Sequence, residues 1–253
     1  MLGTVPCPRG DINSEEQIRR LVTNKIDTVI FDLDGTLVDS QPAALGATIE
    51  ALSRFGVQVT AAELREVFGG GARSLLNHFL QRDLGPDRAT EVLEDAIQVR
   101  ASLQLDLINE VVLLPRVKEL LASLKAGDYK LAMATMSSGA VANSVLVHHG
   151  IKSYFGSVLT IDDVSQIKPD PEILVKTVAR LGGQINRSMY VGDSSHDLEA
   201  AVTLGMPFLL VDSGLYVRGE AREKLRSAAK QNGFSIVKSD EILDIGGIAQ
   251  RQS

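Results

Sequence analysis

The fold and the chemistry of this chain are decided by the stretch Thr28-Val29-Ile30-Phe31-Asp32-Leu33-Asp34-Gly35-Thr36-Leu37-Val38-Asp39-Ser40. Its start, residues 28–31, is mostly apolar and β-branched, which predicts a buried strand. The strand ends at two aspartates one residue apart, Asp32 and Asp34, followed by Gly35. Burial and mutual repulsion would both penalise the ionised forms of this pair. A fold tolerates such a pair if a cation lies between the carboxylates or if one of them stays protonated.

Both arrangements suit phosphoryl chemistry. Asp32 can act as a carboxylate nucleophile, Asp34 as the acid and base, and Mg²⁺ as the cation that offsets the charge. A strand that ends in an ordinary Asp-Gly turn is the structural alternative. A lone Asp-Gly pair would favour that turn, whereas the whole stretch favours a catalytic site.

The composition is that of a globular protein without a membrane segment. The chain has 253 residues, 44% of them apolar, and no stretch is long enough to cross a bilayer. Residues 1–11 contain no hydrophobic run, so we expect no signal peptide. The 26 basic and 32 acidic residues give a net charge of −6, which argues against a nucleic-acid partner. The single cysteine, Cys7, rules out an intramolecular disulfide or a cysteine-based zinc site, and a reducing cytoplasm is the simplest location.

Strand and helix patterns alternate along the second half of the chain. Strands separated by helices predict an α/β fold with a doubly wound (Rossmann-like) parallel sheet. The predicted strands of this sheet span residues 25–31, 129–135, 157–161, 188–191, 207–211 and 234–237. The main helices between them are predicted after Pro115 and at residues 139–149, 169–181, 197–204 and 221–231.

The segment from residue 41 to residue 113 has a different pattern. Leu45, Ile49 and Leu52 repeat at helical spacing, and Thr60 with Glu63 has the spacing of a capping box. No convincing strand lies between residues 41 and 109, so we expect an all-helical insertion directly after the first strand. The chain is therefore predicted to have three parts: a leader with a short helix from Ser14 (1–24), an α/β core (25–40 and 114–253) and the helical insertion (41–113).

Further polar residues follow the other predicted strands, at the edge where open parallel sheets bind ligands. Thr135 ends one strand and Met136 leads into a helix, so a hydroxyl and fresh helix N–H groups would suit a phosphoryl oxygen. Lys168 lies in a loop, where a fixed cation would offset developing charge. Asp193 leaves another strand and Asp197 lies one helical turn further on, which suits a metal ion. Taken singly, each residue also has a structural explanation as a helix cap or a solvated charge.

Taken in order, these residues resemble the four signatures of the haloacid dehalogenase superfamily. The resemblance covers about residues 25 to 240, the chain without its leader. It implies a Mg²⁺-dependent phosphatase that works through an aspartyl-phosphate, with the helical insertion as a mobile cap domain. The catalytic residues implied are Asp32, Asp34, Thr135 and Lys168. The metal ligands implied are Asp32, Asp34, Asp193 and Asp197, and the substrate-binding residues are Gly35, Thr135, Met136 and Lys168.

The segment of residues 68–75 resembles the cap loop of phosphoglycolate-phosphatase-like members. Its glycines would let the backbone approach an anion, and Arg73 could bind a carboxylate or a second oxyanion through two nitrogens. An ordinary helix–helix loop with an exposed arginine is the alternative. We therefore carry Arg73 as a candidate substrate-binding residue.

Asp34 discriminates among the chemistries of the superfamily. The dehalogenases resemble this motif without the second aspartate, whereas phosphatases and phosphomutases need it to protonate the leaving oxygen. The cap lysine of phosphonoacetaldehyde hydrolases has no counterpart, because no lysine lies between Lys25 and Lys118. The first choice is a phosphatase of a small phosphorylated metabolite, with phosphoglycolate as the substrate. The alternatives are a β-phosphoglucomutase-like phosphotransferase, a pyrophosphatase and a non-catalytic binding or regulatory module. The sequence leaves open whether the protein is a monomer or a homodimer.

Overall fold

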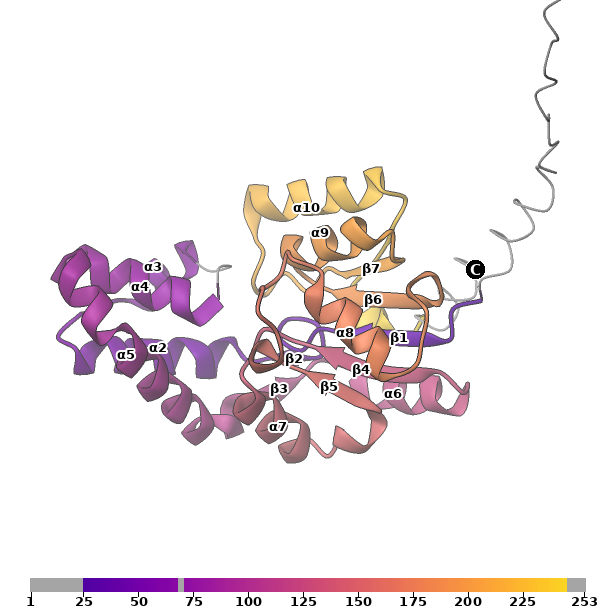
Figure 1. Cartoon of the computed structure of the whole chain (residues 1–253), viewed down its shortest axis with the longest axis horizontal. Helices are drawn as coiled ribbons and strands as arrows, with labels where there is room; N and C mark the ends of the chain where they lie inside the picture. The colour runs from indigo at the N-terminus through magenta and orange to yellow at the C-terminus, as the bar shows by residue number, and fades with distance from the viewer. Residues whose placement is uncertain (1–24, 68–70, 245–253) are drawn as a thin grey trace, which may run out of the picture.

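A parallel sheet of six strands forms the centre of the computed structural model, which describes residues 25–67 and 71–244. Its strand order is β5-β4-β1-β6-β7-β8, with β1 in the middle (Figure 1). The strands are β1 (Thr28–Phe31), β4 (Lys130–Ala134), β5 (Ser157–Leu159), β6 (Ser188–Gly192), β7 (Phe208–Val211) and β8 (Ser235–Val237). Every pairing is parallel, so the predicted doubly wound sheet is confirmed.

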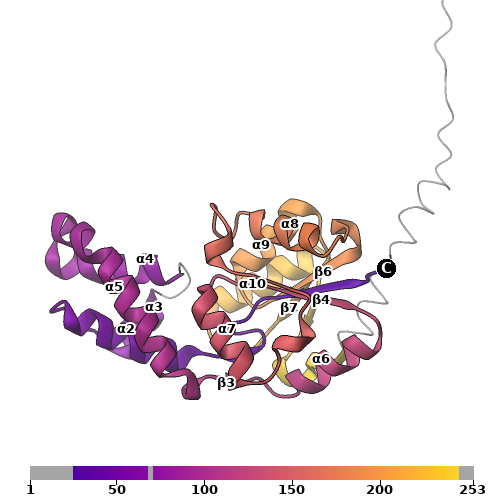
Figure 2. The ribbon, with the colours of Figure 1, turned by 60° about the horizontal axis from the view of Figure 1, so that its bottom comes forward.

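Helices cover both faces of this sheet (Figure 2). α6 (Val117–Ala126) and α7 (Gly139–His148) pack on one face, and α8 (Glu172–Arg180), α9 (Ser195–Leu204) and α10 (Gly219–Gln231) on the other. Side chains alternate between the faces, as a strand requires: Val29 and Phe31 of β1 face α6 and α7, whereas Ile30 faces the second layer. Short 3₁₀ turns complete the layers at Lys152–Tyr154, Ile161–Asp163, Ile185–Arg187 and Ser239–Asp244.

A group of four helices stands beside the sheet (Figure 1). They are α2 (Gln41–Arg54), α3 (Ala61–Glu66), α4 (Gly71–Leu84) and α5 (Pro86–Asp106), followed by the short turn η1 (Ile108–Glu110). They bury an apolar core of their own, which includes Leu52, Leu76 and Phe79. The predicted capping box at Thr60 is confirmed, because its hydroxyl accepts from Glu63 N while the Glu63 carboxylate accepts from Thr60 N. We call this group the cap.

The cap joins the sheet through a ribbon of two short strands that the sequence did not reveal. β2 (Val38–Asp39) pairs antiparallel with β3 (Val112–Leu113), one strand on each side of the cap in the chain. Strands of two residues carry no periodicity, so only the pairing of distant segments identifies them. The proposed division into a core (25–40 and 114–253) and a cap (41–113) is supported by this ribbon and by the separate apolar core of the cap.

The structure also bears on the predicted helices and on the absence of a membrane segment. The predicted helix over 169–181 begins only at Glu172, because Pro171 disfavours helical geometry at the residue before it. The predicted helix from Ser14 and the loop glycines at positions 69 and 70 lie outside the described residues. In the part of the chain that the structure describes, no helix has the length and apolar character to span a membrane.

Candidate active site

The predicted site residues of the core meet at the carboxyl ends of β1, β4 and β6. Asp32 directly follows β1, Thr135 follows β4 and Asp193 follows β6, and these three strands are neighbours in the sheet. Asp197 lies in the first turn of α9, and Lys168 lies in the loop before α8. Parallel strands present their carboxyl ends at the same edge, which is why residues over 160 positions apart come together.

Lys168 is the centre of a buried network of hydrogen bonds. Its ammonium group Nζ lies 2.8 Å from Asp32 Oδ1, 2.7 Å from Asp197 Oδ1 and 2.8 Å from the hydroxyl of Tyr190. Only 6% of Lys168 and 6% of Asp32 is exposed to solvent. The lysine is therefore a fixed cation between two carboxylates.

Burial and charge act in opposite directions on these groups. Burial by itself would lower the pKa of Lys168, but Asp197 and Asp32 outweigh it and raise the pKa above its ordinary value. Burial raises the pKa of Asp32 even though the lysine beside it acts in the opposite direction. The cluster thus contains four carboxylates (Asp32, Asp34, Asp193 and Asp197) and one ammonium group, that of Lys168. Its acidic groups outnumber its basic group.

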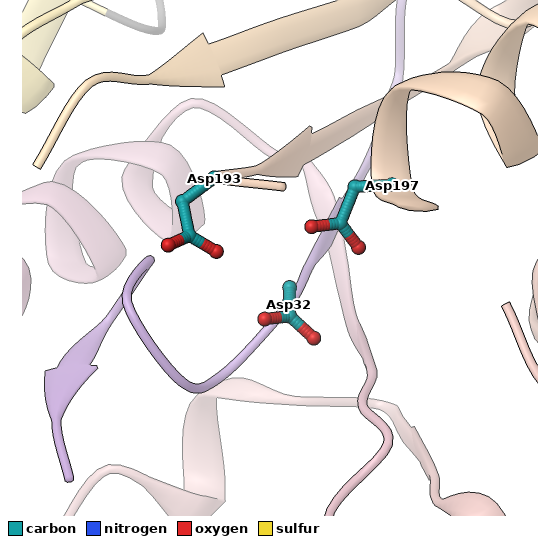
Figure 3. A group of neighbouring side chains, drawn as sticks. All are labelled: Asp32, Asp193 and Asp197. Atoms are coloured by element: carbon teal, nitrogen blue, oxygen red, sulfur yellow. The ribbon is translucent and has the colours of Figure 1, made fainter. Parts of the chain in front are cut away.

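Asp193 has the least compensated of these carboxylates. It is 6% exposed, and its carboxylate accepts no hydrogen bond from the described residues. Burial, followed by the charges of Asp197 and Asp32, raises its pKa well above the ordinary value. Figure 3 shows the carboxylates of Asp193, Asp32 and Asp197 gathered between the end of β1 and the start of α9, and their nearest oxygens lie within 4.8 Å of one another. A hard divalent cation such as Mg²⁺ fits this oxygen cluster.

Asp197 differs from Asp193 because the protein satisfies both of its oxygens. Oδ1 accepts from Lys168 and from the Tyr190 hydroxyl, each at 2.7 Å. Oδ2 accepts from the backbone N–H of Ser194 at 3.1 Å and from its hydroxyl at 2.6 Å. Asp197 is thereby better placed to hold the lysine than to serve as a free metal ligand.

Two serine hydroxyls hold the carboxylate of Asp34. Ser40 Oγ donates to Oδ1, and Ser137 Oγ donates to Oδ2 at 2.6 Å. The Ser40 hydroxyl also shares a hydrogen bond with the Tyr216 hydroxyl at 2.7 Å. Asp34 is only half-buried, so it lies at the boundary between the buried cluster and solvent. This is a suitable position for a group that exchanges protons with a substrate or a water molecule.

Two glycines make room for this arrangement. Gly35 has φ +83°, and a Cβ atom there would lie 2.1 Å from Asp193 Oδ2. A Cβ atom at Gly192 would lie 2.6 Å from Cβ and Cγ of Asp197. A side chain at either position would therefore displace a carboxylate of the cluster.

Thr135 and Met136 form the start of the loop from β4 to α7. Thr135 is 1% exposed, and its hydroxyl oxygen accepts from the backbone N–H of Ser137 at 3.1 Å. That bond leaves the hydroxyl proton available to a ligand oxygen. Met136 is half-buried beside it. The structure thus brings both residues to the same sheet edge as Asp32.

Arg73 makes its observed contacts within the cap. Its guanidinium group donates to both carboxylate oxygens of Glu94 on α5, at 2.6 and 2.7 Å, and the two side chains are largely exposed. The substrate-binding role predicted for Arg73 stays a prediction, and it would require this ion pair to open.

Sequence reasoning did not identify four residues that complete the site. They are Ser40, Ser137, Tyr190 and Tyr216. Two of them could have been found from the sequence, because Ser40 ends the stretch of residues 28–40 and Ser137 directly follows Thr135 and Met136. Tyr190 carried the pattern of an ordinary buried strand residue, and nothing local marks Tyr216.

Comparison with known proteins adds independent evidence. The family model of haloacid dehalogenase-like hydrolases matches residues 29–211. The chain is 32% identical over 197 residues to a probable phosphatase, IndB, of Dickeya dadantii, which covers 77% of this chain and 84% of that protein. It is 33% identical over 212 residues to a phosphoglycolate phosphatase of Salmonella typhimurium, covering 76% and 83% of the two chains.

Solved structures show the same fold. A crystal structure of a predicted phosphoglycolate phosphatase from Haemophilus somnus superposes with a TM-score of 0.74 at 24% identity, covering 89% of this chain and 99% of that one. A β-phosphoglucomutase from Clostridium difficile superposes with a TM-score of 0.70 at 21% identity, covering 90% and 97%. At these identities the similarity extends to the fold alone.

Proposed function

The chain belongs to the haloacid dehalogenase-like hydrolase family, and on that premise we propose that it is a Mg²⁺-dependent phosphatase of small phosphomonoesters. The observation that carries the proposal is the contrast between Asp32, which the Lys168 ammonium holds, and Asp193, a buried carboxylate without a donor among the described residues. A cluster with four carboxylates and one ammonium suits a cation and a phosphoryl group more than it suits a structural role.

In this proposal Asp32 is the nucleophile. Its carboxylate attacks phosphorus and forms an aspartyl-phosphate, while Asp34 protonates the oxygen of the departing alcohol. Asp34 then takes a proton from the water molecule that hydrolyses the acyl phosphate. The serines at positions 40 and 137 keep the Asp34 carboxylate oriented for both transfers.

The remaining residues would bind the phosphoryl group and the metal ion and offset their charges. The Thr135 hydroxyl and the backbone at Gly35 and Met136 bind phosphoryl oxygens in this proposal, and Lys168 offsets the charge on the same group. Asp32, the backbone carbonyl of Asp34 and Asp193 would hold Mg²⁺. Asp197 would support the site by holding the lysine. When bound, Mg²⁺ supplies charge neutralisation for the nucleophile and for the phosphoryl group.

Phosphoglycolate is the substrate we propose. The support is the identity of about a third with the phosphoglycolate phosphatase of S. typhimurium. A cytoplasmic enzyme would meet this metabolite, and the single cysteine is in keeping with a reducing compartment. Transfer to a sugar phosphate, as in β-phosphoglucomutases, is the alternative. It shares the aspartyl-phosphate, and similarity of fold does not favour one outcome over the other.

The proposal is tested with p-nitrophenyl phosphate and a panel of small phosphate esters in the presence and absence of Mg²⁺. We expect Mg²⁺-dependent turnover in which released phosphate equals the substrate consumed. The variant Asp32→Asn should be inactive while keeping its fold. Full activity in excess EDTA, or near wild-type rates in Asp32→Asn, would contradict the scheme. Conversion of β-glucose 1-phosphate to glucose 6-phosphate without phosphate release would identify a mutase.

A further inference from the structure

A second arginine of the cap, Arg100, lies in the second half of α5 (Pro86–Asp106). From the end of this helix the chain returns through η1 to β3 and the core, and Figure 2 shows α5 reaching toward β3. The side chain is half-buried between α5 and α2. Its Nε donates to Thr48 Oγ1 on α2 at 2.8 Å, and one terminal nitrogen donates to Gln104 Oε1 at 3.0 Å. Both partners are buried and uncharged, so two neutral side chains fix the guanidinium group in place.

Arg100 lacks the anionic partner that many other arginines of the chain have. Among residues 25–67 and 71–244, no carboxylate oxygen lies within 4 Å of its guanidinium nitrogens. Arginines with such partners pair as follows: Arg73 with Glu94, Arg82 with Glu63 and Asp83, and Arg222 and Arg226 with Asp212. Two of the five N–H groups of Arg100 donate to described residues, which leaves three for a ligand. A half-buried cation without a counter-charge costs free energy unless a bound anion compensates it.

The groups that favour the charged form of Arg100 lie in or beside the catalytic site. Burial lowers the pKa of Arg100, and the groups that oppose this effect are Asp34 and Tyr216. Tyr216 shares a hydrogen bond with Ser40, which in turn donates to Asp34. Arg100 is therefore within electrostatic reach of Asp34, the residue that protonates the departing alcohol in the proposed reaction.

Helix α2 connects Ser40, which holds Asp34, to Thr48, which holds Arg100. α2 begins directly after Ser40, and Thr48 lies eight residues further along the chain, which corresponds to about 12 Å along a helix. Arg100 and Asp34 form no ion pair, because the carboxylate oxygens of Asp34 lie more than 4 Å from the guanidinium nitrogens. A substrate whose phosphate lies at Asp32 could extend toward the guanidinium group.

We propose that Arg100 is a specificity-determining residue that binds a carboxylate on the departing group of the substrate, so that the enzyme selects small phosphorylated carboxylic acids. This inference rests on the phosphatase proposal and assigns the second anion of the substrate to Arg100 instead of Arg73. The planar guanidinium group presents its remaining N–H donors side by side, a geometry that matches the two oxygens of a carboxylate.

The test compares two substrates in matched variants. Arg100→Gln removes the charge and keeps a polar side chain. Arg100→Lys keeps the charge and removes the planar pair of N–H donors. Arg88→Gln is the control on the same helix, because Arg88 is exposed and pairs only with Glu91 among the described residues. We expect Arg100→Gln to lower kcat/KM for phosphoglycolate about 30-fold or more and to leave p-nitrophenyl phosphate within about threefold, since a charge-assisted bidentate contact is lost. The kcat/KM of Arg100→Lys for phosphoglycolate should lie between the values of Arg100→Gln and wild type.

A binding measurement separates this inference from the phosphatase proposal. In the Asp32→Asn background with Mg²⁺, calorimetry should show that Arg100→Gln weakens phosphoglycolate binding at least tenfold and leaves inorganic phosphate binding unchanged. Equal losses for both substrates, or selectivity that follows Arg73→Gln instead, would overturn the role of Arg100. A wild-type preference for esters without a carboxylate would overturn it and leave the phosphatase standing. Absence of turnover with every ester would overturn the phosphatase proposal alone, provided that the binding difference persists.

Discussion

The ammonium group of Lys168 lies 2.8 Å from the carboxylate of Asp32, although 136 positions separate the two residues in the chain. The contact is almost fully buried, with 4% of the lysine side chain and 9% of the aspartate side chain exposed. A buried ion pair of this kind stabilises a fold poorly when compared with apolar packing. Its position next to three more acidic residues points to a role in chemistry.

Lys168→Met should lower kcat about 100- to 1000-fold, because it removes the one ammonium group that offsets the charge of the carboxylates and of the phosphoryl group. Turnover of p-nitrophenyl phosphate measures this effect. Lys224→Met, on the exposed face of α10, is the control and should keep wild-type kcat. A Lys168→Met enzyme with more than a tenth of wild-type activity would remove the lysine from the mechanism.

Tyr190→Phe should lower kcat about tenfold with little change in KM. The Tyr190 hydroxyl lies 2.8 Å from Lys168 Nζ and donates to Asp197 Oδ1 at 2.7 Å, so its loss loosens the lysine without touching the substrate. A purely structural role would appear as a lower melting temperature at unchanged kcat. The same substitution at Tyr154, which lies in a 3₁₀ turn on the other face of the sheet, should change neither quantity.

Asp193→Asn should raise the melting temperature of the metal-free protein and abolish its stabilisation by Mg²⁺. The raised pKa of Asp193 means that its ionised form destabilises the folded state at neutral pH, so a neutral side chain relieves that penalty. Thermal melts in EDTA and in Mg²⁺ measure both effects. The expected loss of Mg²⁺ affinity is about 100-fold or more for Asp193→Asn and smaller for Asp197→Asn. Asp95→Asn, on the cap surface, is the control, and equal Mg²⁺ stabilisation of all variants would contradict the metal site.

Asp212→Asn should destabilise the fold by about 2 kcal/mol at pH 7. The buried carboxylate of Asp212 accepts from Arg222 and Arg226 of α10, and so ties that helix to the end of β7. Burial by itself would raise the pKa of Asp212, but the two arginines outweigh it and hold the pKa below its ordinary value.

The pH dependence of this contribution follows from the lowered pKa. Stability that comes from a carboxylate with a lowered pKa is present above its ordinary value of about 4 and is lost as the pH falls through the lower value in the folded state. Urea titrations of wild type and Asp212→Asn should therefore differ by a constant amount from about pH 5 to pH 8. The difference should shrink below about pH 4. A difference that persists undiminished at pH 2 would show that the arginine contacts are not its source.

The sequence by itself determined the sheet and the main catalytic candidates. Apolar runs such as residues 28–31 specify buried strands because their β-branched side chains pack on both faces of the sheet. The polar residues that follow parallel strands lie at the same edge of the sheet. Asp32, Lys168 and Asp193 could be assigned to a single site for that reason, before any distance was known.

Tertiary structure alone decided how the acidic residues differ from one another. In the sequence, Asp193 at a strand end is predicted to be a direct metal ligand, and Asp197 one helical turn further on could bind the metal directly or through another group. In the fold, Asp197 receives four hydrogen bonds, whereas Asp193 receives none from the described residues. Which donor reaches which oxygen depends on contacts between segments far apart in the chain, and local patterns carry no record of those contacts.

Two arginines of the cap, Arg73 and Arg100, also differ in a way that the sequence does not show. Arg73 follows a glycine-rich loop, which predicts a substrate-binding role, yet its side chain pairs with Glu94. Arg100 lies inside an unremarkable helical stretch, and its importance comes from Thr48 on the neighbouring helix and from the absence of a carboxylate among its described neighbours. The sequence determines which charges exist, and only the packing of α2 against α5 determines which of them has no anionic partner among the described residues.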